Sequence, residues 1–124
     1  MQVSSIVYLE IPAPNFEDSK KFYAEAFNWK ITESTMKNKP YAMFETGKTE
    51  MGLTSGGLNP DLLPLPEKSL GLYISVENIP EALKRVSKHG GLTLKEKTKI
   101  SGDYGHYAVF KDPSGNHMCL WSKT

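Results

Sequence analysis

The predicted order of secondary structure is the same in the two halves of this chain, and this repetition constrains the fold more than any single motif does. A strand, an amphipathic helix and three further strands are predicted in about residues 3–55, and the same series returns in about residues 70–124. Residues 56–69 between them hold three of the eight prolines and are expected to form a linker. We therefore predict one domain, residues 1–124, with an α+β fold made of two βαβββ modules.

Local signals mark where each helix starts and stops. Asn15 is the expected N-cap of the first helix, and Asn78 followed three residues later by Glu81 is the expected capping box of the second. Gly90 suits the left-handed conformation that often closes a helix. The expected strands are residues 3–11, 30–35, 41–47, 49–55, 70–77, 92–100, 105–110 and 116–122.

The composition excludes several classes of protein. The net charge is +1, and no basic patch of the kind that binds nucleic acid is present. No apolar run is long enough to span a bilayer, and the first residues do not resemble a secretory signal. A single cysteine excludes an intramolecular disulfide framework and a cysteine-cluster zinc site. We expect a cytoplasmic protein that binds neither nucleic acid nor membranes.

Alternation along the predicted strands separates two faces, because side chains two residues apart project from the same side of a sheet. One face is aliphatic or methionine throughout: Val7, Leu9, Ile11, Met51, Leu53, Leu72, Ile74, Val76, Met118 and Leu120. The opposite face mixes polar, aromatic and glycine residues: Tyr8, Glu10, Glu50, Gly52, Thr54, Gly71, Tyr73, Ser75, His117, Cys119 and Trp121. We expect the first face to lie beneath the helices and the second to form a ligand cleft or a dimer interface.

Three stretches, "YLEIPAPNFEDSKKFYAEAFNW", "YISVENIPEALKRVSKHGG" and "YAVFKDPSGNHMCLW", together resemble the glyoxalase/bleomycin-resistance/extradiol-dioxygenase group, the vicinal oxygen chelate superfamily. They look most similar to the branch related to lactoylglutathione lyase. The resemblance covers nearly the whole chain. It implies paired βαβββ modules that form a curved mixed sheet around a cleft, usually within a homodimer.

The resemblance also implies where a metal would bind. Metalloenzymes of this group typically carry a histidine or glutamate on the first and last strand of each module, and these side chains hold a divalent ion. The matching positions here are Tyr8, Gly52, Gly71 and Cys119. None is a histidine or a carboxylate, and the glycines have no side chain. We therefore predict a degenerate metal site and no bound cofactor, with a divalent metal as the alternative.

Two main hypotheses for function remain open at this point. The first is a protein that binds a small organic molecule. Its predicted cleft is lined by Tyr8, Glu10, Tyr73, His117, Cys119 and Trp121. The second is an enzyme, either a glyoxalase-related lyase or isomerase or a dioxygenase-like protein. A dimer with no ligand is a third interpretation.

The enzyme hypothesis has two forms. In one, His106 and His117 hold a relocated metal together with a glutamate, either Glu50 or Glu10. In the other, Glu10 or Glu45 performs acid–base chemistry without a metal, and Glu10 is the stronger candidate because aromatic residues share its face. Cys119 is interpreted as a small, half-buried sheet residue rather than a nucleophile.

Overall fold

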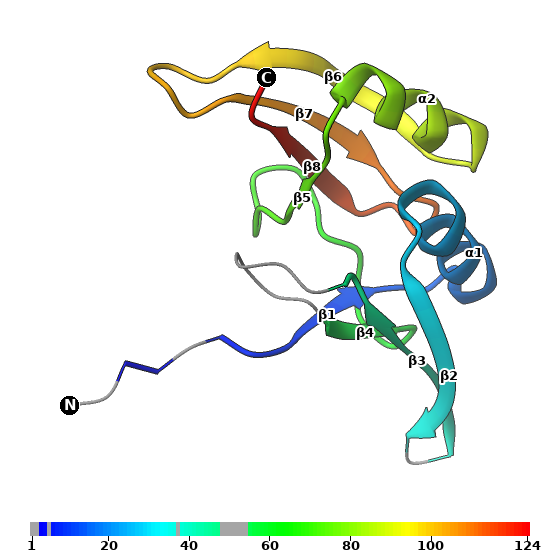
Figure 1. Ribbon diagram of the computed structural model, residues 1–124. Coiled ribbons are helices and arrows are strands. Elements are labelled where there is room, and N and C mark those ends of the chain that lie inside the picture. Colours follow the sequence, from blue (N-terminus) through cyan, green and yellow to red (C-terminus); the bar gives the residue numbers. More distant parts are fainter. Residues whose placement is uncertain (1–2, 5, 37, 48–54) are drawn as a thin grey trace.

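Two four-stranded sheets, each backed by one helix, lie one above the other in the view of Figure 1. This computed structural model describes residues 3–4, 6–36, 38–47 and 55–124. Helix α1 packs on the first sheet, α2 packs on the second, and the two helices contact each other. The elements are β1 (Leu9–Pro12), α1 (Phe16–Phe27), β2 (Lys30–Met36), β3 (Lys39–Glu45), β4 (Ser55–Asn59), β5 (Tyr73–Ser75), α2 (Ile79–Lys88), β6 (Leu92–Lys99), β7 (His106–Lys111) and β8 (His117–Ser122).

The two sheets have the same strand order, which confirms the predicted α+β fold with a repeated arrangement. The first sheet is ordered β1-β4-β3-β2 and the second β5-β8-β7-β6. In the first sheet β1 runs parallel to its neighbour β4, and in the second β5 runs parallel to its neighbour β8. All other neighbouring strands are antiparallel. Strands β1 and β5 therefore lie at corresponding edges of two open sheets.

Several predicted strand boundaries are wrong: besides β4 and β1, β3 covers 39–45 instead of 41–47 and β5 covers 73–75 instead of 70–77. Strand β4 extends from Ser55 to Asn59, so the first four residues of the expected linker 56–69 belong to a sheet. Pairing with both β1 and β3 satisfies the backbone groups of this segment, although its two glycines weaken the strand signal in the sequence. Strand β1 begins at Leu9 rather than at residue 3. The predicted strand 49–55 lies outside the described residues, except for Ser55.

Both helices begin directly after their predicted N-cap residue, Asn15 or Asn78, and the second helix also ends as predicted. Asn78 Oδ1 accepts a hydrogen bond from the Glu81 backbone N–H at 2.9 Å, and Gly90 has a φ of 97°. Asn15 occupies the predicted N-cap position, but its side chain makes no cap hydrogen bond, and Asn15 Nδ2 instead donates to Asp18 Oδ2 at 3.0 Å. In the described part of the chain, neither helix is long and apolar enough to cross a membrane.

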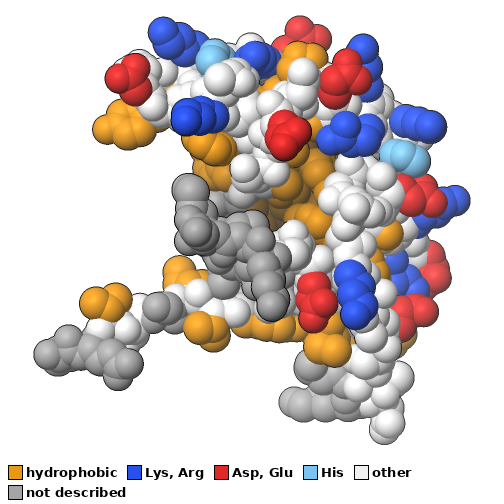
Figure 2. Space-filling view, in the orientation of Figure 1, with side chains coloured by type: hydrophobic (Ala, Val, Ile, Leu, Met, Phe, Trp, Pro, Cys, Tyr) orange, Lys and Arg blue, Asp and Glu red, His pale blue; other side chains and the backbone are white. Residues whose placement is uncertain are grey.

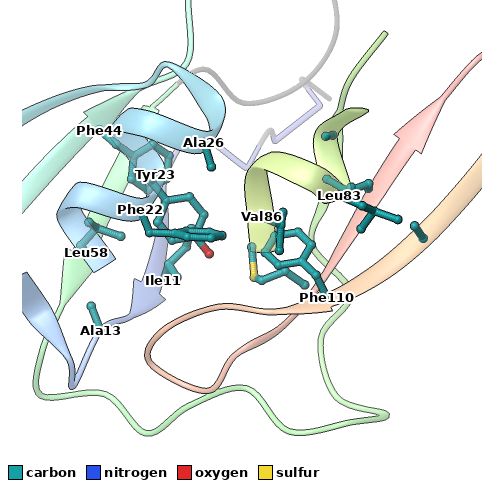
Figure 3. Close-up of a cluster of buried hydrophobic side chains, with 14 of the residues drawn as sticks. Ile11, Ala13, Phe22, Tyr23, Ala26, Phe44, Leu58, Leu83, Val86 and Phe110 are labelled. Atoms are coloured by element: carbon teal, nitrogen blue, oxygen red, sulfur yellow. The ribbon is translucent and has the colours of Figure 1, made fainter. Parts of the chain in front are cut away.

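The aliphatic face predicted from alternation supplies much of the core. Its fully buried members are Ile11, Met118 and Leu120. The rings of Phe22 on α1 and Phe110 on β7 are 5.9 Å apart between centroids, and Figure 3 shows both within one cluster that reaches α2. One hydrophobic core therefore spans both halves of the fold. Val7 does not follow the prediction, because it precedes β1 and is 75% exposed, while Met51 and Leu53 lie outside the described residues.

The "DPSGN" turn before β8 is buried and joins the second half of the chain to the first. Tyr23 Oη donates to Asp112 Oδ2 at 2.7 Å, and Asn116 Nδ2 lies 2.8 Å from the same oxygen. Asn116 Nδ2 also lies 2.6 Å from the Pro12 carbonyl, and Asn116 Oδ1 accepts from the Leu65 backbone N–H at 2.8 Å. These contacts hold β8 in place relative to β1. We call Tyr23, Asp112 and Asn116 the buried turn cluster.

Burial shifts the titration of the buried turn cluster. It raises the pKa of Asp112, although the hydrogen bonds from Asn116 and Tyr23 favour the charged form. Burial, followed by the charge of Asp112, raises the pKa of Tyr23 well above its ordinary value. The Tyr23 hydroxyl therefore stays protonated and available as a donor.

Candidate functional site

The faces of the two sheets that point away from the helices, together called the open face here, carry the side chains predicted to line a cleft. In β8, half-buried His117, Cys119 and Trp121 alternate with buried residues. The register places Glu10 beside Gly57 in the first sheet and Tyr73 beside Cys119 in the second. Figure 2 shows a hollow between the two sheets with hydrophobic side chains inside it.

On the first sheet, four polar residues form a hydrogen-bonded group, which we call the tyrosine–glutamate cluster (Tyr8, Glu10, Tyr41 and Asn59). Tyr41 Oη donates to Glu10 Oε2 at 2.8 Å and lies 2.7 Å from Tyr8 Oη. Because a phenol has one proton, Tyr8 must be the donor to Tyr41. Asn59 Nδ2 donates to Glu10 Oε1 at 3.3 Å. The result is a directed chain of donors that ends on one carboxylate.

The side chain of Tyr41 is the buried member of the tyrosine–glutamate cluster. It is 3% exposed, whereas Tyr8 is 42% exposed. Burial is the largest cause of a raised Tyr41 pKa, followed by the contacts with Tyr8 and Glu10, and the rise takes the pKa far above the ordinary value of a phenol. Tyr41 therefore remains a neutral donor to Glu10.

Gly57 on β4 makes room for this cluster. A Cβ atom at this position would overlap Tyr41 Oη and would lie 2.8 Å from Tyr8 Oη. Any larger residue must therefore displace one of the two phenols. Gly52, the position predicted from the resemblance, lies outside the described residues. The described β4 residue that faces Tyr8 is Gly57, which also has no side chain to offer a metal.

On the second sheet, Tyr73 and Cys119 are neighbours across the β5–β8 pair. Burial raises the pKa of the Cys119 thiol, although a hydrogen bond with Tyr73 lowers it. The charge of a Cys119 thiolate in turn raises the pKa of Tyr73, with burial as the second cause. A thiol with a raised pKa is a weak nucleophile, which agrees with the structural interpretation of Cys119.

Trp121 and Tyr107 extend the aromatic part of the open face. They are directly opposite each other in the β7–β8 register. Trp121 Nε1 donates to the Tyr104 carbonyl at 2.7 Å, and Lys95 Nζ lies 2.6 Å from Tyr107 Oη. The second sheet therefore offers rings beside a cation, while the first offers rings beside a carboxylate.

The expectation that His106 and His117 approach each other is wrong. His117 pairs with Lys111 and His106 with Ser122, so they are five residues apart along β8, about 17 Å at strand spacing. They also project from opposite faces, because five is an odd number of residues. Glu50, a proposed third ligand, lies outside the described residues.

The donors on the open face do not fit a divalent metal. Tyr8 Oη is hydrogen-bonded to Tyr41, Cys119 is a single thiol whose strand neighbour is Tyr73, and Gly71 has no side chain. Within residues 3–4, 6–36, 38–47 and 55–124, no group of three or more His, Cys, Asp or Glu side chains is placed to hold a metal ion.

Three residues of the tyrosine–glutamate cluster environment were missed by the sequence reasoning: Tyr41, Gly57 and Asn59. Alternation in the third predicted strand could have placed Tyr41 on the open face. Gly57 and Asn59 lay in the expected linker and carried no usable signal. Glu45 ends β3 on the same face as Tyr41 but takes no part in the cluster's hydrogen bonds.

Comparison with known proteins identifies the class. The Glyoxalase/Bleomycin resistance protein/Dioxygenase superfamily profile matches residues 5–120. With the repeated βαβββ order and the open face already described, this match shows that the chain belongs to that superfamily. The earlier resemblance is therefore confirmed.

The individual relatives share only a small fraction of their residues with this chain. The chain is 26% identical over 123 residues to a glyoxylase-like domain-containing protein of Didymella fabae, covering 98% of this chain and 94% of the relative. A glyoxylase/bleomycin resistance protein/dioxygenase domain from Frankia sp. EAN1pec has a similar fold, with a TM-score of 0.74 at 17% identity over 99% of this chain and 100% of that one. An antibiotic binding protein from Streptomyces sp. CB03234 gives a TM-score of 0.70 at 19% identity over 100% and 99% of the two chains. At these identities the structures establish a shared fold.

Proposed function

We propose that this protein binds a small organic molecule on the open face and holds no divalent metal at the positions that carry ligands in metal-bearing relatives. The observation that carries the proposal is the tyrosine–glutamate cluster, which includes Tyr8, the position that the resemblance assigns to a metal ligand. Half-exposed aromatic rings add stacking surface: Tyr8 is 42% exposed and Tyr73 is 59% exposed. The similar fold of an antibiotic binding protein supports the same proposal.

A thermal-shift screen against metabolites and antibiotics, combined with metal analysis of the purified protein, tests this function. A ligand at about a hundred times its dissociation constant should add about 2.7 kcal/mol to the free energy of unfolding. Tyr8→Ala and Trp121→Ala should weaken the binding of a stabilising compound. Leu63→Ala, at an 86% exposed position outside the strands, should not. A stoichiometric divalent ion that survives dialysis would contradict the metal-free part of the proposal.

We also propose that the protein forms a homodimer. Val3, Ile6 and Val7 precede β1 and are 87%, 74% and 75% exposed, which is an unusual concentration of apolar side chains in water. Among the described strands, β1 and β5 each have a neighbour on one side only, and such edges can pair with another chain. Sedimentation velocity should show a dimer that Val7→Asp weakens, while Leu63→Asp leaves it unchanged. A monomer at all concentrations would contradict this proposal.

Acid–base catalysis through Glu10 is the second candidate function. It is favoured by the donor chain from Tyr8 through Tyr41 to Glu10, since such a chain holds a carboxylate in a fixed orientation. A compound identified by the screen would be incubated with the protein in D₂O and followed by NMR. Exchange of a carbon-bound proton that is lost in Glu10→Gln supports catalysis, and no exchange above the uncatalysed rate supports binding alone.

A further inference from the structure

The hydrogen bonds of the tyrosine–glutamate cluster determine what a ligand can add to it. The Tyr41 proton is committed to Glu10, and the Tyr8 proton is therefore committed to Tyr41. Glu10 and Tyr8 are the exposed members of the cluster. The hydrogen-bonding groups that they still offer are acceptors, namely the lone pairs of the Glu10 carboxylate and of the Tyr8 phenol oxygen. A ligand that meets these atoms must bring the hydrogen-bond donor itself.

The charge of the cluster points in the same direction. Among the residues that the structure describes, none of the ion pairs involves Glu10. Its two donors, Tyr41 and Asn59, are both neutral. Glu10 is exposed, and its hydrogen bond from Asn59 lies at the surface, so a ligand can reach this carboxylate. A positively charged donor would complete this site, whereas an anion would be repelled.

Apolar side chains flank the carboxylate and suit the rest of such a ligand. Tyr8 presents a 42% exposed ring two residues before Glu10. Met43 lies opposite Gly57 in the β3–β4 register, on the same face, and is 43% exposed. A ring face and a thioether beside a carboxylate form a suitable environment for an ammonium group attached to an apolar body.

We propose that the tyrosine–glutamate cluster binds the ammonium group of an amine ligand, with the nitrogen donating to the Glu10 carboxylate and the Tyr8 oxygen and with its apolar part against the Tyr8 ring and Met43. This inference rests on the proposed binding function, because it names the class of ligand for the same face. Gly57 is required for this binding site, since a Cβ atom there would displace the phenols that orient Glu10.

Three probes that share one ring test the inference: benzylamine, benzyl alcohol and benzoate. Each is titrated into the full chain and followed by the backbone amide signals of β1 and β4 in NMR spectra. Benzylamine should bind at least tenfold more tightly than benzoate, with the alcohol between them. Glu10→Gln should weaken benzylamine at least tenfold. Glu45→Gln is the matched control, because it removes an equal charge from the same face outside the cluster, and it should change binding less than twofold.

Several results would overturn the inference. Equal affinities of benzylamine and benzoate for the unaltered protein would do so without any variant, even if Glu10→Gln failed to fold. An equal loss in Glu10→Gln and Glu45→Gln would mean that the ligand responds to the general field and not to the cluster. If benzoate or the alcohol perturbs the open face and benzylamine does not, only the amine class fails. If neither these probes nor any compound of the thermal-shift screen perturbs the open face, the proposed binding function fails with it.

Discussion

Two clusters in this molecule are built from the same three chemical groups, a tyrosine hydroxyl, a carboxylate and an asparagine amide. In the buried turn cluster Tyr23 and Asn116 donate to Asp112, at 2.7 and 2.8 Å. In the tyrosine–glutamate cluster Tyr41 and Asn59 donate to Glu10, at 2.8 and 3.3 Å. The residue types alone therefore do not separate a structural network from a candidate binding site.

The two clusters differ in how many hydrogen bonds their carboxylate accepts and in how deeply that carboxylate is buried. Asp112 is 3% exposed, and its second oxygen also accepts from the backbone N–H groups of Ser114 and Asn116, at 3.0 and 2.9 Å. Glu10 is exposed, and among the residues that the structure describes each of its oxygens has one donor. A saturated carboxylate can only hold the fold together, whereas an unsaturated and accessible one can also bind something else.

The largest expected effect is on the buried turn cluster. Asp112→Ala removes the acceptor of four hydrogen bonds and leaves buried donors without partners. We expect it to lower the free energy of unfolding by about 3 kcal/mol or more, measured by urea denaturation. Asp103→Ala, at an exposed position, is the control and should change stability by less than about 0.5 kcal/mol. If Asp112→Ala lowered the free energy of unfolding by less than about 1 kcal/mol, the buried turn cluster would not have the structural role that distinguishes it from the tyrosine–glutamate cluster.

Gly57→Ala should damage the tyrosine–glutamate cluster directly. Its methyl group would overlap Tyr41 Oη, so we expect a loss of about 1–3 kcal/mol in stability together with loss of benzylamine binding. Gly71→Ala is the matched control in the second half, since its Cβ would meet only the Tyr73 ring, at 3.2 Å. Binding that survives Gly57→Ala unchanged would show that the ligand does not use this cluster.

Removing one hydroxyl from each cluster compares them most closely. Tyr23→Phe leaves the buried Asp112 short of a donor, so we expect a loss of about 2 kcal/mol. Tyr41→Phe should cost about 1 kcal/mol or less, because water can replace the donor at the exposed Glu10. Thermal and urea unfolding of the pair measure the difference. The reverse order of the two losses would contradict the assignment of structural and binding roles.

The smallest expected effect concerns pH. Burial raises the Asp112 pKa above its unfolded value near 3.9, so the folded state binds this proton more tightly. Binding of this proton by the folded state adds to the free energy of unfolding. The full contribution is present below about pH 3.9, and it is lost as the pH rises through the pKa of Asp112 in the folded state. The unaltered protein should therefore lose stability relative to Asp112→Asn over that range. A relative gain with rising pH would show that the hydrogen bonds to the carboxylate outweigh its burial.

The sequence predicted the fold well because alternation and helix signals are local. The alternation of His117, Cys119 and Trp121 with buried residues in β8 follows directly from strand geometry. The boundary at β4 failed because Gly56 and Gly57 have no β propensity, and only pairing with β1 and β3 makes them a strand. Tertiary contacts, not local preference, decide such segments.

The candidate site was predicted only in part. Tyr8 and Glu10 were placed on the correct face, but their hydrogen-bonded partners Tyr41 and Asn59 come from other strands. No short-range pattern links residues more than thirty positions apart in the chain. The supposed proximity of His106 and His117 failed for the same reason, because a hairpin brings two strands together but the register decides which residues meet.

The most direct test of the account is NMR mapping of a compound that stabilises the protein in the thermal-shift screen. We predict amide shifts concentrated at residues 8–11, 57–59 and 117–121, which belong to the segments that carry open-face side chains, and none in the buried turn cluster. Shifts centred on the helices α1 and α2, with the open face unchanged, would contradict it.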